Sequence, residues 1–178
     1  MRTCRSCGTR TTILSFLSTG INQVIKITNK VDTNVMAMFT LTLPFDSRHK
    51  ARLYTHLDSG EEAGIFLPRG LILRGGDKLQ AESGEIIEII SANEDVSTAT
   101  SDDPLLLMRA SYHLGNRHVP LEVKPGYLRF HFDHVLNEML EHLNLSVTKE
   151  FAPFEPESGA YSQDPEQTHT HSHQHHHE

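Results

Sequence analysis

The chain has 178 residues, a hydrophobic share of 37% and a formal net charge of −7. This length fits one compact domain or two small ones, and the net negative charge argues against a general phosphate-binding role, because counterion release needs clustered Lys and Arg. No stretch approaches the ~18 apolar residues of a membrane-spanning helix. The basic, Ser/Thr-rich start has no apolar run of signal-peptide length. We therefore expect a soluble, cytoplasmic protein.

Residues 1–23 are expected to form a disordered extension. They contain Cys4 and Cys7, a CxxC pair and the two cysteines of the chain. A structural zinc site usually needs a second ligand pair at fixed spacing, and none lies nearby. We therefore favour an unstructured extension, or a misassigned start, over a metal or redox site.

Residues 24–92 predict a small, β-rich domain. Apolar or alternating runs indicate strands in VIKI, AMFTLTL, ARLYTHL and AGIFLP, with a hairpin turn at DSGEE. GLILRGGDKLQ and GEIIEIIS indicate two more strands, and no helical period of useful length occurs before residue 100. Gly75 and Gly76 favour a turn over a phosphate-binding loop, since such a loop requires a helix directly after the glycines.

Residues 93–155 predict a second domain with the element order β-α-β-β-α-β, the ferredoxin-like arrangement. Strands are expected in DVSTA, HVPLEV, YLRFHF and LSVTKEF. Helices are expected in SDDPLLLMRASYHLG and in DHVLNEMLEHLN, whose apolar residues recur at helical spacing. The whole chain is therefore expected to be α+β.

Both expected helices carry signals at their ends. Gly115 suits the left-handed position that ends the first helix, and Asp133 suits the cap of the second. His113 and His142 fall in the last turns, where a cation meets the negative end of the helix dipole. The candidate caps of the first helix are Ser101, Asp102 and Asp103.

Residues 156–178 are expected to form a flexible, His-rich tail. After Phe151 the chain becomes rich in Pro, Ser and acidic residues, although its aromatic residues could dock onto the domain. The last ten residues read HTHSHQHHHE, and the interruptions by Thr, Ser and Gln distinguish them from a purification tag. Chelation by such a segment should be modest in affinity and fast in exchange, because ordering it costs entropy. Its histidines are His169, His171, His173, His175, His176 and His177.

Histidine is the residue type that points to chemistry here. The chain has no GxSxG, HExxH or Walker motif, whereas imidazole nitrogen suits Ni²⁺, Cu²⁺ and Zn²⁺. His118 lies in a connection, where binding sites often occur. His131 and His134 flank Asp133, which could ligate a metal, orient an imidazole or cap a helix. Each of the three histidines could instead be an ordinary surface or half-buried residue. We expect His49 and His56 to lie at the surface.

Four segments carry a family resemblance: LPRGLILRGGD, YHLGNRHVPLEV, PGYLRFHFDHVLNEML and PFEPESGAY, followed by the His-rich tail. From Ile25 onward the chain resembles the UreE family of urease accessory proteins, which act as nickel metallochaperones. The resemblance implies a partner-binding domain over 24–92, and a metal-binding and dimerisation domain over 93–155. It also implies a homodimer.

The resemblance also implies roles for single residues. Two copies of His118 would meet across the dimer axis and share one ion, since a two-fold axis doubles every ligand. His134 matches a histidine of peripheral sites in some relatives, and His131 matches a family histidine of unassigned role. Phe132 and Ser101 stand where some relatives have His and Cys, which weakens the case for a full peripheral site.

The implied function is not enzymatic. The chain would carry Ni(II) as cargo to the urease assembly complex, with the urease accessory GTPase and the urease apoprotein as partners. Zn(II) or Cu(II) can also bind imidazole sites, and no nucleic-acid or membrane partner is expected. Two alternatives stay open: a metal-dependent hydrolase that uses His118, His131, His134 and Glu138, and a passive nickel store built around the tail.

Overall fold

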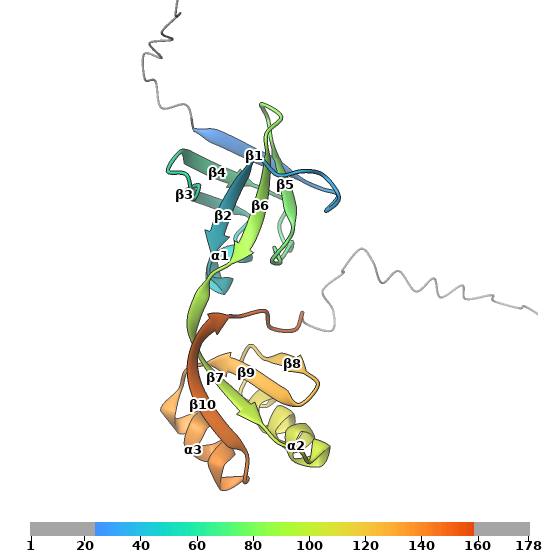
Figure 1. Ribbon diagram of the computed structural model, residues 1–178, viewed down its shortest axis with the longest axis vertical. Helices are drawn as coiled ribbons and strands as arrows, with labels where there is room; N and C mark the ends of the chain where they lie inside the picture. The colour runs from blue at the N-terminus through green and yellow to red at the C-terminus, as the bar shows by residue number, and fades with distance from the viewer. Residues whose placement is uncertain (1–23, 159–178) are drawn as a thin grey trace, which may run out of the picture.

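The computed structural model describes residues 24–158, which form two units, each built on one β-sheet, arranged end to end along the long axis of the molecule (Figure 1). The expectations for residues 1–23, including Cys4 and Cys7, and for the tail histidines lie outside the described residues. Within residues 24–158, no helix has the length and apolar character needed to cross a membrane.

The first unit is mostly β, as expected. Its sheet has the strand order β2-β6-β5-β1-β4-β3. Burial alternates along β2, β3 and β6, which is typical of half-buried strands, whereas β4 buries three consecutive residues. The strands are β1 (Ile25–Val31), β2 (Phe39–Leu43), β3 (Arg52–His56), β4 (Glu62–Phe66), β5 (Lys78–Ala81) and β6 (Ile86–Ser91).

Two segments of the first unit differ from the sequence prediction. The four-residue helix α1 (Phe45–Arg48) follows Pro44, whose carbonyl oxygen accepts from the N–H of Arg48 at 3.2 Å. One helical turn is too short to show a helical period in the sequence. Residues 70–77 form no strand: the N–H of Leu73 bonds to the carbonyl of Arg48, and Gly76 has φ +90°. The expected turn at Gly76 is confirmed, since strand β5 and no helix follows it.

The second unit contains the sheet β10-β7-β9-β8, whose neighbouring strands are all antiparallel, and two helices. Leu114 of α2 and Leu140 of α3 share one buried core with Leu128 and Phe130 of β9. The α+β class is therefore confirmed. The elements are β7 (Asn93–Thr100), α2 (Pro104–Gly115), β8 (Glu122–Lys124), β9 (Tyr127–His131), α3 (His134–His142) and β10 (Ser146–Pro153).

Both helices begin as their sequences predict. The Asp103 carboxylate accepts from the N–H of Leu105 at 2.8 Å, and Pro104 is the first residue of α2. The Asp133 carboxylate accepts from the N–H groups of Val135 and Leu136 at the start of α3. Such caps satisfy backbone donors that a helix leaves unpaired and contribute about 1 kcal/mol each.

The joint between the two units is built around Arg48, whose side chain is 0% exposed. Arg48 Nη1 lies 2.7 Å from Glu155 Oε1, and Nη2 donates to the carbonyl of Phe154, just after β10. The guanidinium carbon also lies 5.6 Å from the ring centroid of Phe45. Arg48 therefore connects the first unit to the end of the second, across 107 residues of sequence.

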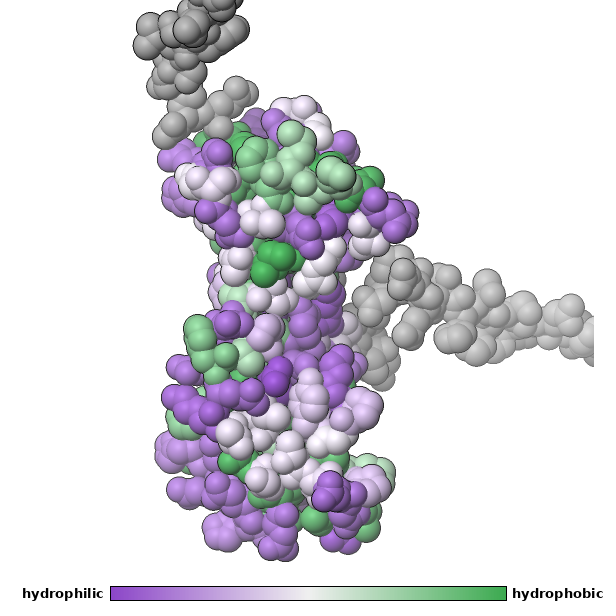
Figure 2. Space-filling model, in the orientation of Figure 1, coloured by the Kyte–Doolittle hydropathy of each residue, from purple (hydrophilic) through white to green (hydrophobic). Residues whose placement is uncertain are grey.

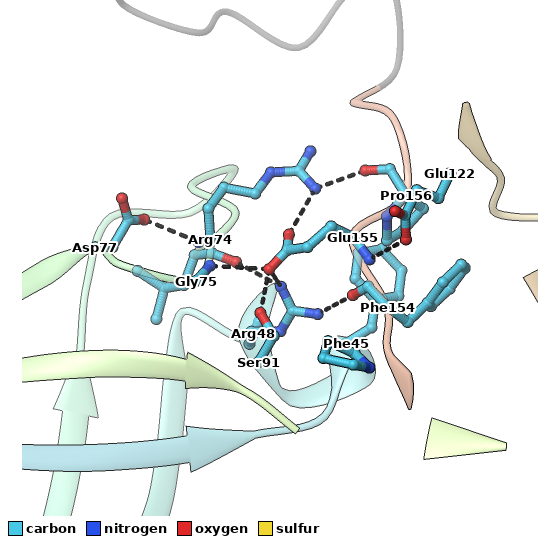
Figure 3. A network of polar contacts seen from close by, with 12 residues as sticks. Phe45, Arg48, Arg74, Gly75, Asp77, Ser91, Glu122, Phe154, Glu155 and Pro156 are labelled. Carbon is cyan, nitrogen blue, oxygen red and sulfur yellow. Dashed lines mark hydrogen bonds and ion pairs between the residues drawn. The ribbon is translucent and has the colours of Figure 1, made fainter. Parts of the chain in front are cut away.

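Glu155 forms hydrogen bonds with both units (Figure 3). Its carboxylate accepts from the Ser91 hydroxyl, from the Gly75 N–H at 2.9 Å and from Arg74 at 3.3 Å, besides Arg48. Its own N–H donates to the Glu122 carboxylate at 3.0 Å. A charged group with this many partners holds the two units in one arrangement.

The chain just beyond Glu155 is also attached to both units. Arg74 donates to the Pro156 carbonyl at 2.5 Å and to the Ser158 hydroxyl at 2.6 Å, while the Glu157 N–H donates to the Leu121 carbonyl at 2.8 Å. Residues 156–158, which the sequence predicts to be part of the flexible tail, thus contact the folded units. Buried Phe154 confirms that an aromatic residue of this segment docks onto the protein.

We expect the joint to weaken in acid. Burial acts to raise the pKa of Glu155, but hydrogen bonds from Ser91, the Gly75 N–H and Arg48 outweigh it and hold the pKa below its usual value. A lowered folded-state pKa stabilises the protein above the unfolded value of about 4.3, and this stabilisation is lost as pH falls through the folded pKa. Denaturant unfolding at a series of pH values should show Glu155→Gln losing stability less steeply than the wild type below pH ~4.

The matched control for this experiment is Glu157→Gln, which changes an exposed carboxylate two residues away. Its acid dependence should equal that of the wild type. An unchanged acid dependence in Glu155→Gln would contradict the assignment of acid sensitivity to the joint.

Candidate metal centre

His118 lies in the connection between α2 and β8, and its side chain is exposed. Its φ of 55° is left-handed. The sequence predicts that conformation for Gly115, but Gly115 ends α2 without a positive φ. The His118 N–H donates to the Gly115 carbonyl at 2.9 Å, and the Val119 N–H donates to the Leu114 carbonyl at 3.3 Å. These two bonds form a Schellman motif, in which His118 occupies the position that glycine usually takes.

Core packing holds this turn in place. Leu114 is fully buried, and Val119 packs against the same cluster, so the residues on either side of the connection are anchored. Strand β8 begins at Glu122, later than the strand expected from residue 118. The left-handed conformation of His118 interrupts the extended backbone, and Pro120 has no N–H to donate to a sheet. A non-glycine residue in this conformation costs about 1–2 kcal/mol, and such strain persists where the surroundings impose it, often at functional sites. The imidazole therefore stands on a fixed turn.

His134 is the first residue of α3 and is exposed. Of the three roles left open for Asp133, the structure shows the cap, because one carboxylate oxygen accepts from both the Val135 and Leu136 N–H groups. The neighbouring Phe132 ring has Lys149 Nζ 4.2 Å from its centroid. Among residues 24–158, His134 belongs to no group of three His, Cys, Asp or Glu side chains placed to hold a metal ion.

His131 is half-buried at the end of β9 and belongs to the joint. Its Nε2 lies 2.9 Å from Glu94 Oε2, and its ring centroid lies 4.5 Å from that of Phe154. The other oxygen of Glu94 accepts from the Phe45 N–H of the first unit at 2.7 Å. This imidazole nitrogen is therefore engaged in holding the units together. Glu94 cannot be recognised from the sequence, because a lone carboxylate at the start of a strand gives no signal of its partner.

The three candidate histidines come from different elements. His118 follows α2, His131 ends β9 and His134 begins α3. Among residues 24–158, no three His, Cys, Asp or Glu side chains are arranged to hold a metal ion. A catalytic metal centre usually takes about three protein ligands. The described part of the chain therefore offers single imidazoles.

The remaining histidines of the described residues occupy the expected places. His113 and His142 lie in the last turns of α2 and α3. Both line a groove of about 500 Å³ between these helices, together with Glu138 and Arg117. His49 and His56 are exposed, as expected.

Comparison with known proteins adds the family. The model of the UreE urease accessory protein N-terminal domain matches residues 21–92, and that of the C-terminal domain matches residues 94–178. A urease accessory protein UreE of Citrobacter koseri is 51% identical over 147 residues, which cover 82% of this chain and 97% of that protein. That of Enterobacter sp. is 53% identical over 142 residues, covering 79% and 93%.

A third relative agrees with these two. The urease accessory protein UreE of Pseudomonas putida strain F1 is 57% identical over 127 residues, which cover 71% of this chain and 76% of that protein. All three relatives carry the name urease accessory protein UreE. Since family models match both units and the relatives are matched over most of their length, the chain belongs to the UreE family of urease accessory proteins and is not an enzyme.

Proposed function

We propose that this protein is a cytoplasmic nickel metallochaperone, which binds Ni(II) as cargo and delivers it to the urease assembly complex. The observation that carries the proposal is His118, an exposed imidazole on a turn fixed by core packing. A carrier must bind its ion and also release it. A site with few ligands, left open to the ligands of a partner, meets both requirements, and imidazole nitrogen suits Ni²⁺.

A homodimer would complete this site. One imidazole is a poor site, whereas a two-fold axis at His118 would bring a second copy of it. An exposed apolar stripe on α2, formed by Leu105, Met108 and Tyr112, supports a protein interface in the same unit. These residues follow the helical spacing i, i+3, i+7 and share one side of the helix. Apolar contacts, rather than the ion, would then hold the dimer.

The arrangement of the second unit supports separate roles for the two domains, one in metal binding and one in partner binding. Its element order, β7-α2-β8-β9-α3-β10, and its sheet order, β10-β7-β9-β8, fit a ferredoxin-like domain. We infer that residues 93–155 form this metal-binding and dimerisation domain and that residues 24–92 form the domain that binds partners. The proposed partners are the urease accessory GTPase and the urease apoprotein. Zn(II) and especially Cu(II) would compete at an imidazole site, since Cu²⁺ binds nitrogen ligands more tightly than Ni²⁺ does.

The tail histidines would bind additional metal ions weakly and exchange them rapidly. Removing residues 169–178 should reduce the number of bound nickel ions but leave one tighter ion per dimer, because His118 lies outside the tail. Calorimetric nickel titration of the full chain and of a chain ending at Thr168 measures this directly, with native mass spectrometry to count ions and protomers.

The same titration separates the metallochaperone from the passive store. A store built around the tail predicts that the shortened chain binds no nickel, and this result would reject the proposed site at His118. The chain belongs to a family of urease accessory proteins, which argues against a metal-dependent hydrolase.

A further inference from the structure

The two edge strands of the first sheet, β2 and β3, are joined just after the end of β3: the Asp58 N–H donates to the Thr40 carbonyl at 3.0 Å, and the Thr42 N–H donates to the Asp58 carboxylate at 3.0 Å. Before that point, β3 pairs with β4 on one side, and no described residue pairs with the backbone of Arg52–His56 on the other. Exposed large hydrophobic residues of this unit are Val35, Met36, Met38, Tyr54, Phe66 and Ile90.

Figure 2 shows hydrophobic surface gathered over the upper, six-stranded unit, whereas hydrophilic surface dominates the lower one. The open β3 edge therefore lies on the unit whose visible surface is richer in hydrophobic residues.

The register of the β3–β4 hairpin identifies the free backbone groups. Bonds from Leu67 N–H to the Ala51 carbonyl and from Leu57 N–H to the Glu61 carbonyl mark the hydrogen-bonded pairs at its two ends. Bonded and non-bonded pairs alternate in an antiparallel ladder. The N–H and C=O groups of Arg52, Tyr54 and His56 must therefore point away from β4, toward the open edge.

Uncompensated cations lie at the beginning of this edge. Lys50, Arg52 and Arg69 are exposed, and none forms an ion pair with another described residue. The bond from Leu67 to Ala51 brings the Arg69 segment beside the start of β3. In a chain with a net charge of −7, this end of β3 is a local site of attraction for an acidic segment.

Aromatic side chains flank the same edge. Tyr54 is 60% exposed and faces Gly64 of β4 in the register, while Arg52 faces Phe66. The Phe66 ring covers Gly64 so closely that a Cβ there would lie 2.8 Å from Cε2 of the ring. Such rings offer packing area to the side chains of an added strand.

We propose that the open edge of β3 binds an extended, acidic segment of a partner protein, which adds to the sheet as a further strand. Free backbone groups provide the hydrogen bonds of strand addition, and Lys50, Arg52 and Arg69 select for acidic residues. Cations on an edge strand also prevent unwanted pairing between sheets, so the site admits an acidic strand and rejects a basic one. This inference rests on the proposed partner-binding role of residues 24–92 and names the chemistry of that partner.

The test uses the full chain and a synthetic peptide of alternating Thr and Glu. Amide hydrogen exchange, followed by NMR, should show increased protection at Arg52, Tyr54 and His56 when the peptide is added, with little change at Leu53 and Thr55. A peptide of alternating Thr and Lys should give no protection. Arg52→Glu should lower the affinity for the acidic peptide by about ten-fold or more, the loss expected for a contacting charge pair. The same variant should bind the Lys peptide more tightly than the wild type does.

The control variant is Lys124→Glu, which reverses an exposed cation on β8, an edge strand of the other sheet. It should bind the acidic peptide as the wild type does. The proposal is overturned if the acidic peptide protects no amide from exchange, or protects amides outside β3. It is also overturned if Arg52→Glu and Lys124→Glu lower the affinity for the peptide equally. Protection of β3 that rises with protein concentration alone would assign the edge to a second copy of the chain. Nickel titration of Arg52→Glu should match the wild type, which tests the proposed metal site separately.

Discussion

Arg48→Ala is expected to destabilise the protein by about 3–5 kcal/mol, the cost typical of removing one partner from a buried ion pair. Arg48 is fully buried, and its loss leaves the Glu155 carboxylate and the Phe154 carbonyl without their shared donor. Chemical denaturation monitored by circular dichroism measures the change in the free energy of unfolding. Arg69→Ala is the control, because Arg69 is exposed and should change stability by less than about 0.5 kcal/mol.

A double-mutant cycle resolves how the joint is held. Arg48→Met combined with Glu155→Gln removes both charges, so the double variant should be more stable than the sum of the two single effects predicts. Additive effects would show that Arg48 and Glu155 contribute independently. Small-angle X-ray scattering of Arg48→Met should show a broader range of distances between the units, since Arg48 links them directly. An unchanged scattering profile in a folded variant would contradict this role.

His118→Gly is expected to remove the tighter nickel site and yet to leave the protein as stable as the wild type, or more stable by up to about 1 kcal/mol. Glycine adopts the left-handed conformation without the strain that His118 carries at φ 55°. His118→Ala removes the same imidazole but keeps the strain. Without metal, His118→Gly should therefore unfold at a higher temperature than His118→Ala. Nickel titration in chains ending at Thr168 should show that neither variant binds the tighter ion.

Two controls distinguish an effect on nickel binding from an effect on folding in the His118 variants. His56→Ala removes an exposed histidine of the other unit and should leave the tighter ion in place. Analytical ultracentrifugation in metal-free buffer should find the same dimer in wild type and His118 variants, because apolar contacts are proposed to hold it. One tight ion per dimer in His118→Ala would refute the assigned ligand, and a monomer would refute the proposed basis of dimerisation.

The stability expected of His118→Gly separates function from folding at this position. If the variant gains stability while it loses nickel, the histidine is retained at a cost to the fold. That outcome is what a ligand in a strained conformation predicts. If it loses stability, the imidazole itself contributes to packing in the proposed dimer, and the side chain that is exposed in the single chain is covered in solution.

Local signals were enough to predict most elements. The strands β1 to β4 and β6, and the starts of both long helices, follow from alternation, helical spacing and the capping residues Asp103 and Asp133, all of which act over a few residues. His118 could be singled out because it lies in a connection and belongs to a recognisable segment. The tail histidines could be singled out by composition alone. Their roles as ligands are still proposals.

Contacts between distant residues decided the rest. Arg48 and Glu155 are 107 positions apart, and His131 and Glu94 are 37 apart, so no local pattern pairs them. The same holds for the open edge of β3, which depends on the order of all six strands.

The end of α2 shows the division most clearly. By itself the sequence determined that the helix stops within LGNRH, because glycine and the polar residues after it favour termination. Which residue becomes left-handed was decided by the tertiary structure: burial of Leu114 and packing of Val119 against the core fix the length of the turn and put His118 at the strained position. The sequence thus determined where the proposed metal ligand lies, and core packing decided the backbone conformation of that residue.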